Sequence, residues 1–482
     1  MVVVFVLVAL LVLACVVAAN WYLWRRLFRD TTRGPGPVRR AGAVLIAGGW
    51  LLAIAAFAGT RAGIPFWLKR ALAWPGYLWL ALSLYLLLAV LATEPLRPVL
   101  HRLLGRSAAR DAGPGRTERT DAAREPASVS EPAFEAGAGS GTGPAAEAGS
   151  GSGPAGTESG QAPAHDVRAK SGGCAVAEAQ AVSEGAVSEE AVSGEAVPAG
   201  EEPARPQALT RRLFVSRVMA GAAAAAAVGT VGHGTYGVLR GPRVKRVTVP
   251  LAKLPRAAHG FRIAVVSDIH LGPVLGRGFA QKVVDTINAT QPDLIAVVGD
   301  LVDGSVKDLG PAAAPLAGLR ARHGAYFVTG NHEYFSGAEQ WVEEVRRLGL
   351  LPLENARTEL PGFDLAGVND IRGEHEGQGP DFERALGDRD PARACVLLAH
   401  QPVQIHEAVR YGVDLQLSGH THGGQLWPGT FLAAAANPTV AGLERYGDTQ
   451  LYVTQGAGAW GPPTRVGAPS DITVVELASK QA

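Results

Sequence analysis

Two histidines separated by a single residue, His420 and His422, stand among small residues in the stretch Leu417 to Gly424. Side chains two positions apart on an extended segment share a face, so both imidazoles could hold a metal. The neighbouring glycines let the backbone turn and approach the ion closely. Histidine pairs on surface turns are common, however, so this pair predicts a metal site only with support from elsewhere in the chain.

Four further segments place metal-binding residue types directly after short apolar runs. Ile263–Val266 is followed by Asp268 and His270, Leu294–Val298 by Asp300 and Asp303, Tyr326–Thr329 by Asn331 and His332, and Val396–Ala399 by His400. Short, partly β-branched runs separated by helix-like sequence are typical of buried strands in an α/β fold. Ligands gather beyond the carboxyl ends of such strands, so we expect all these polar side chains to meet at one edge.

Over roughly Val247 to Leu477 the chain resembles the calcineurin-like metallophosphoesterases, in five motifs that occur in the family's order. They are Asp268-x-His270, Gly299-Asp300-x-x-Asp303, Gly330-Asn331-His332-Glu333, His400 and Gly419-His420-x-His422. Five ordered motifs are far more specific than any one of them. The longer sequences around these motifs, such as Gly-His-Thr-His-Gly-Gly-Gln, are similar to those of the membrane-associated bacterial branch of this family. The resemblance implies an α/β fold of two packed mixed β-sheets flanked by helices, here preceded by an α-helical transmembrane region.

The resemblance also implies a centre of two divalent metal ions. Asp268, His270 and His422 would hold one ion, Asn331, His400 and His420 would hold the other, and Asp300 would bridge them. A bridging carboxylate offsets the repulsion between two cations about 3.5–4 Å apart. Carboxylate, imidazole and amide oxygen together suit Mn²⁺, Fe²⁺ or Zn²⁺, and the lack of a ligating cysteine argues against a structural zinc.

His332, next to Asn331, is the expected catalytic residue. It would stabilise the transition state or protonate the leaving oxygen, and the alternative is a purely orienting role. Asp303 and Glu333 are expected to orient ligating imidazoles. Arg465 either binds two oxygens of a substrate phosphate through its guanidinium or is an ordinary surface arginine.

Hydrophobic residues make up 47% of the chain, and their excess over a typical soluble protein lies at the amino-terminal end. Val2–Trp24, Ala41–Ala58 and Trp74–Ala92 are each long and apolar enough to cross a bilayer, so residues 1–104 are predicted to form a membrane region with three transmembrane helices. Buried core helices of a soluble domain are the alternative. Arginines fill the connection between the first two stretches, which by the positive-inside rule is cytoplasmic and leaves the amino terminus outside.

Residues 105–208 are rich in Gly, Ala, Ser, Pro and Glu and predict a disordered linker. In residues 209–240, Arg211 and Arg212 precede an Ala/Gly-rich apolar run, which predicts either a fourth transmembrane helix or a twin-arginine-like signal anchor. Both alternatives place residues 247–482, the predicted catalytic domain, outside the membrane, although a basic cluster from Arg240 to Arg246 counts against this side. A net charge of +1 and few basic or aromatic runs argue against a nucleic-acid partner.

These features predict a multi-pass, membrane-anchored hydrolase of phosphoric esters with an extracytoplasmic catalytic domain. Its substrate would be a phosphodiester or phosphomonoester, in an envelope lipid or linked to the cell wall, because the membrane confines the site to that surface. The alternatives are a nucleotide or protein phosphatase, and a non-catalytic metal-binding sensory module. A sensory module is expected to have a broken ligand set, whereas all seven ligands named above are present.

Overall fold

The computed structural model describes residues 2–61, 63–100, 102–103 and 211–481 of the chain. The linker predicted over 105–208 lies outside these described residues.

Four long apolar helices lie where membrane spans were predicted. They are α1 (Val2–Trp24, continued by a π-helical turn over Arg25–Arg29), α2 (Pro37–Arg61), α3 (Phe66–Thr93) and α5 (Arg211–Leu239). None of the four contains an Asp or Glu, and each is long and apolar enough to cross a membrane. Helix α3 begins eight residues before the predicted start at Trp74, so it is longer than the span that its apolar run indicated.

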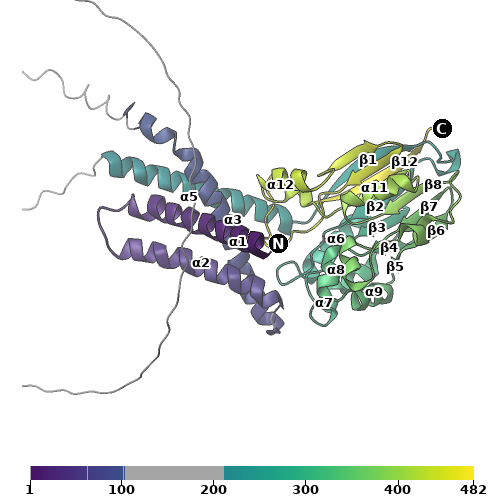
Figure 1. The fold of residues 1–482 in the computed structure, drawn as a ribbon, viewed down its shortest axis with the longest axis horizontal. Coiled ribbons are helices and arrows are strands. Elements are labelled where there is room, and N and C mark those ends of the chain that lie inside the picture. Colours follow the sequence, from purple (N-terminus) through teal and green to yellow (C-terminus); the bar gives the residue numbers. More distant parts are fainter. Residues whose placement is uncertain (1, 62, 101, 104–210, 482) are drawn as a thin grey trace, which may run out of the picture. The chain divides into compact units, whose positions relative to one another are not determined.

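The part of the chain after α5 forms two six-stranded mixed sheets (Figure 1). The first sheet has the order β1 (Arg243–Leu251), β12 (Asp471–Ser479), β2 (Phe261–Val266), β3 (Leu294–Val298), β4 (Ala325–Val328) and β5 (Leu351–Pro352). The second has the order β10 (Gly442–Tyr446), β11 (Thr449–Val453), β9 (Leu415–Ser418), β8 (Ala394–Leu398), β7 (Phe363–Gly367) and β6 (Ala356–Leu360). The predicted α/β fold with two mixed sheets is confirmed.

The two sheets pack face to face, and helices cover their outer faces. Alternate residues explain this layering: Ile263 and Val265 of β2 face Val396 and Leu398 of β8 in the core between the sheets, whereas Ala264 lies in the outer core. Helices α6 (Arg277–Ala289), α7 (Val306–Ala313) and α9 (Ala338–Arg347) cover the first sheet. Helices α10 (Phe382–Leu386) and α11 (Ile405–Arg410) cover the second.

Strand direction brings the motif-bearing loops together. Strands β2, β3 and β4 are parallel neighbours in the first sheet, and β7, β8 and β9 are parallel neighbours in the second. Parallel neighbours end at the same edge of their sheet, which is where ligands collect in α/β folds. The five predicted segments follow β2, β3, β4, β8 and β9.

Helices α3 and α5 contact the sheet-bearing part directly. Lys69 of α3 pairs with Asp308 of α7 at 2.9 Å, and the hydroxyl of Tyr85 donates to the carbonyl oxygen of Trp427 at 3.0 Å. The hydroxyls of Thr235 on α5 and Thr464 lie 2.7 Å apart. Helices α3 and α5 therefore lie beside α7 and the loops that contain Trp427 and Thr464.

Candidate metal centre

The residues predicted to bind metal have an unusual backbone conformation. Eight non-glycine residues in the described part of the chain have positive φ, and five of them are Asp268, His270, Asp300, His420 and His422, with φ between 49° and 71°. A non-glycine residue in this region costs about 1–3 kcal/mol, and such strain clusters at functional sites. The sharp turn directly after each strand points these side chains toward one another.

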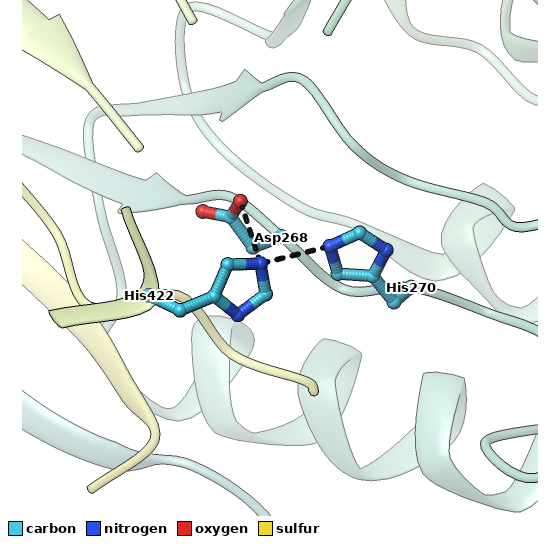
Figure 2. Close-up of side chains that lie close together, drawn as sticks. All are labelled: Asp268, His270 and His422. Carbon is cyan, nitrogen blue, oxygen red and sulfur yellow. Dashed lines mark hydrogen bonds and ion pairs between the residues drawn. The ribbon is translucent and has the colours of Figure 1, made fainter. Parts of the chain in front are cut away.

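Asp268, His270 and His422 form the first cluster (Figure 2). The Nε2 atoms of His270 and His422 lie 3.0 Å apart, and Nε2 of His422 lies 3.3 Å from Oδ1 of Asp268. All three side chains are buried. Burial, and then the neighbouring His270, lower the pKa of His422 well below its usual value, so this ring is neutral and can act as a ligand.

Asp300, His400 and His420 form the second cluster. Nδ1 of His400 donates to the carbonyl oxygen of Val298 at 2.9 Å, which leaves Nε2 facing the cluster, 3.2 Å from Oδ2 of Asp300. Burial lowers the pKa of His400, but the negative charge of Asp300 outweighs burial and raises it well above its usual value. Carboxylates that favour a proton at this position equally favour a metal cation. Burial, followed by His400, lowers the pKa of His420 to about 4.

Asp300 lies between the two clusters. Its Oδ2 is 3.2 Å from Nε2 of His400 in the second cluster and 3.7 Å from Nε2 of His270 in the first. Burial raises the pKa of Asp300, but the surrounding histidines, His400 foremost, hold it well below its usual range. An ionised carboxylate at the boundary of two clusters has the position that a bridging ligand requires.

Two buried polar atoms of the centre have no hydrogen-bond partner. They are Nε2 of His400 and Oδ1 of Asn331, which begins the short helix α8 (Asn331–Ser336). Unsatisfied buried polar atoms are rare in folded proteins because each costs about 1–3 kcal/mol. A metal ion would satisfy both, and the nitrogen and oxygen donors present suit divalent cations. The residues therefore fit the implied metals.

Asp303 contacts imidazoles, as predicted. Its Oδ1 lies 2.9 Å from Nδ1 of His270 and 2.7 Å from Nδ1 of His332. Burial lowers the pKa of His332, but the hydrogen bond and charge of Asp303 outweigh it and raise this pKa to about 9. His332 is thus an imidazolium at neutral pH, and its backbone N–H donates to Oδ1 of Asp300 at 2.9 Å. A protonated imidazole beside a phosphoryl site can donate a proton or stabilise negative charge.

Glu333 contacts the backbone rather than an imidazole, which corrects the expectation for this residue. Its carboxylate accepts hydrogen bonds from the N–H groups of Asp300, Leu301 and Gly330, at 3.0, 2.8 and 2.6 Å. These bonds tie the turn after β3 to the turn after β4. The two turns approach so closely that a Cβ at Gly330 would lie 2.5 Å from the backbone nitrogen of Asp300.

Arg465 matches neither expectation, because it is buried beneath His422. Its Nη1 donates to the carbonyl oxygen of His422 at 3.0 Å, and its Nη2 lies 3.1 Å from Nδ1 of the same ring. Its Nε donates to the carbonyl oxygen of Gly458 at 2.6 Å. Burial lowers the pKa of Arg465 to about 10. The guanidinium therefore holds a predicted ligand in place, and its position in the sequence carried no signal of this role.

A cleft of about 530 Å³ opens beside the centre. His270, Asp303 and His332 line one side of it, and Phe57 of α2 and Tyr77 of α3 line another. The sequence did not indicate that α2 and α3 line this cleft, because about two hundred residues separate them from the motifs and their apolar composition indicated only a span.

Comparison with known proteins agrees with this geometry. A family model described as calcineurin-like phosphoesterase matches residues 261–424. A transmembrane protein with a metallophosphoesterase domain from Danio rerio is 40% identical over 264 residues, which are 52% of this chain and 60% of the relative. An uncharacterized metallophosphoesterase from Helicobacter pylori is 36% identical, over 51% of this chain and 67% of the relative.

Two further similarities concern a shorter relative and a solved structure. An uncharacterized metallophosphoesterase from Aquifex aeolicus is 35% identical, over 49% of this chain and 92% of the relative. A crystal structure of a dimetal phosphatase from Danio rerio matches with a TM-score of 0.34 and 13% identity, over 46% of this chain and 93% of that one. The matched region spans about three fifths of the Danio rerio transmembrane relative.

The matched residues contain all five motifs and both Asp/His clusters, and the vertebrate relative is itself a transmembrane protein. With four helices that could span a membrane, the chain is a multi-pass membrane protein. It belongs to the calcineurin-like metallophosphoesterase family.

Proposed function

We propose that the protein is a membrane-anchored hydrolase of phosphodiesters or phosphomonoesters that uses two divalent metal ions. The observation that carries this proposal is the position of Asp300, whose Oδ2 lies between a nitrogen of His270 and a nitrogen of His400. Asp268, His270 and His422 would hold one ion. Asn331, His400 and His420 would hold the other, and Asp300 would contact both. When bound, such a pair polarises the phosphoryl oxygens and supplies a hydroxide nucleophile at neutral pH.

His332 is proposed as the catalytic residue supplied by the chain itself. The raised pKa, about 9, keeps its ring protonated at neutral pH, and Asp303 fixes the ring through Nδ1. Nε2 is then the atom that carries the transferable proton. We propose that it protonates the leaving oxygen as the ester bond breaks, because an alkoxide is a poor leaving group without a proton.

The catalytic domain is proposed to lie on the extracytoplasmic face, with its substrate in an envelope lipid or linked to the cell wall. Arginine-rich sequence fills the connection between α1 and α2, which the positive-inside rule assigns to the cytoplasm. The next connection, between α2 and α3, then lies outside. Support comes from Lys69, near that connection, which pairs with Asp308 of the catalytic domain.

The test is hydrolysis of 4-nitrophenyl phosphate and bis(4-nitrophenyl) phosphate by the full-length protein in detergent, with and without Mn²⁺. We expect metal-dependent release of 4-nitrophenolate, and a loss of more than about 100-fold in Asp300→Ala. Asp285→Ala, an exposed carboxylate on α6, is the matched control and should keep full activity. A folded protein that hydrolyses neither ester, or an Asp300→Ala variant as active as the control, would contradict the proposal.

A further inference from the structure

The cleft beside His332 has two chemically different sides. His270, Asp303 and His332 belong to the metal centre, whereas Ile54 and Phe57 of α2 belong to a membrane span. None of the described residues that line the cleft is a Lys, Arg, Asn or Gln. A nucleotide or a phosphorylated polypeptide would bring many polar groups next to the phosphate, and outside the metal centre these would find few polar side chains, such as Ser336, to replace the water they lose. The lining instead favours an apolar group attached to the phosphate.

Aromatic side chains connect the centre to the spans without interruption. The ring of His332 lies 5.8 Å from that of Trp460, Trp460 lies 6.3 Å from Phe57, and Phe57 lies 5.2 Å from Tyr77 of α3. Each pair packs edge to face, a geometry that aromatic rings prefer. Ile54, one turn before Phe57 on α2, is 61% exposed and faces the same cleft. An apolar chain leaving the phosphate would therefore meet apolar surface along the whole path.

Helix α12 (Gly429–Ala436) is evidence from another part of the fold that the centre lies at the bilayer surface. It has no buried residue and no charged residue, and Phe431 and Leu432 are 69% and 77% exposed. The helix follows the His422 loop. The hydroxyl of Thr430 donates a hydrogen bond to the carbonyl oxygen of Gly423 in that loop, at 3.0 Å. Leu426, just before α12, packs against α3 and α5. An exposed apolar helix beside membrane spans is suited to enter the bilayer.

We propose that the substrate is a membrane lipid with a phosphate ester, whose phosphate reaches the Asp/His clusters while its apolar chain lies along α2 and α3 in the cleft. This inference rests on the proposed phosphoesterase function. Hydrolysis adds water across one P–O ester bond: the water oxygen joins phosphorus and releases a proton to solvent, and the departing alcohol oxygen takes a proton from His332, which solvent then reprotonates. Because the cleft runs from His332 to α2 and α3, the phosphate can reach the metal centre while the apolar chain of the lipid stays at the membrane spans.

The first experiment compares long-chain and short-chain esters with the same reacting group. The probes are the hexadecyl and ethyl forms of a phosphomonoester, and the hexadecyl and ethyl forms of a 4-nitrophenyl phosphodiester, presented to the full-length protein in mixed micelles. The readout is the ratio of kcat/KM for the long form to that for the short form. The proposal predicts a large ratio for the esters that are hydrolysed.

Two substitutions on α2 separate binding in the cleft from simple partition into the micelle. Ile54 lines the cleft, whereas Leu51 is equally exposed on the same helix, at 67%, and does not line it. We expect Ile54→Ala to lower the long-to-short ratio about fivefold, because it removes apolar contact with the chain, and Leu51→Ala to leave the ratio unchanged. Ala58→Trp, which fills the cleft, should lower the ratio further. A ratio near one, or equal changes in Ile54→Ala and Leu51→Ala, would overturn the proposal.

A binding measurement that needs no turnover separates this proposal from the proposed function. Hexadecylphosphonate that carries a photoactivatable diazirine in the chain cannot be hydrolysed, and its crosslinks are located by mass spectrometry. Crosslinks to Ile54, Phe57 or Trp460, suppressed by excess unlabelled hexadecylphosphonate, support the lipid cleft even if ester hydrolysis fails. Crosslinks spread evenly over the exposed face of α1, with none in the cleft, overturn the lipid inference even if soluble esters are hydrolysed.

Discussion

At the scale of single residues, His332 is the group on which the proposed chemistry depends. It shares Oδ1 of Asp303 with His270, so one carboxylate positions both a predicted ligand and the predicted acid. A residue that only orients its neighbours would affect all substrates alike. A proton donor matters most where the leaving oxygen is basic.

We therefore predict that His332→Gln lowers kcat unequally for two substrates. For an alkyl phosphate ester, whose leaving alkoxide needs a proton, the loss should be about 100-fold to 10,000-fold. For a 4-nitrophenyl ester, whose leaving group departs as a stable anion, it should be much smaller. Steady-state kinetics on both esters tests this, and equal losses would instead support an orienting role.

The raised pKa of His332 predicts a pH-dependent stability in the metal-free protein. The imidazole has a pKa of about 9 in the folded protein and about 6.5 in an unfolded chain, so its contribution to stability is fully present below pH 6.5 and is lost as the pH rises through 9. Thermal unfolding in EDTA should show a difference between the wild type and His332→Gln at pH 6 that shrinks toward pH 9.5. A difference that grows with pH would contradict this.

Residue types and spacing predicted that these polar side chains meet at one edge, but they did not predict how the side chains are held. Asp268, Asp300 and His400 each follow an apolar run that local sequence identifies as a strand. Their convergence then requires only that these strands end at the same edge of the fold. Arg465 is different, because nothing in its neighbourhood indicates that it lies under His422, which precedes it by 43 residues. Such a contact depends on tertiary packing, which a local pattern does not encode.

At the scale of elements, the turn after β4 sets the position of Asp300. Gly330 leaves no room for a side chain, because the Asp300 backbone lies against it. We predict that Gly330→Ala lowers the free energy of unfolding by about 1–3 kcal/mol and weakens metal binding, since the turn after β3 must move. Chemical denaturation and metal content give the two readouts.

Gly278→Ala is the control for this prediction. Gly278 lies in the first turn of α6 with no other atom near its would-be Cβ, so alanine should be neutral or slightly stabilising there. If Gly330→Ala behaved like this control in both measurements, close packing of the two turns would not be what positions Asp300.

The apolar runs that predicted strands all lie inside the sheets. They form β2, β3, β4 and β8, and each of these strands has a neighbour on both sides. None of the four sheet-edge strands, β1, β5, β6 and β10, was predicted from such a run. Edge strands are half exposed, so β10, Gly-Leu-Glu-Arg-Tyr, contains two adjacent charged residues and lacks the apolar run that marks a buried strand.

At the scale of the whole molecule, the four spans fix which connections share a side with the catalytic domain. In a chain without its native cysteines, we predict that Gly63→Cys and Asp448→Cys react with a membrane-impermeant maleimide in intact cells, whereas Gly34→Cys does not. Gly63 lies between α2 and α3, Asp448 lies between β10 and β11, and Gly34 lies between α1 and α2. Labelling of Gly34→Cys alone would place the domain in the cytoplasm.

The cleft is the feature that least followed from the sequence. Composition and length predicted spans, and spacing predicted a metal centre, but neither indicated that α2 and α3 border that centre. Their proximity depends on contacts such as Val274 packing beside Ala73 and Tyr77, which join distant parts of the chain. Apolar residues on a span have no local feature that separates a lipid-facing position from one in a cleft.

The central claim is that the Asp/His clusters hold two metal ions about one carboxylate, and counting those ions tests it most directly. Inductively coupled plasma mass spectrometry of the purified full-length protein, after saturation with Mn²⁺ and removal of the excess, should give two ions per chain. His400→Ala should retain one, because the first cluster, Asp268, His270 and His422, remains complete. A folded wild-type protein that binds one ion or none, or a His400→Ala variant that still binds two, would contradict the account.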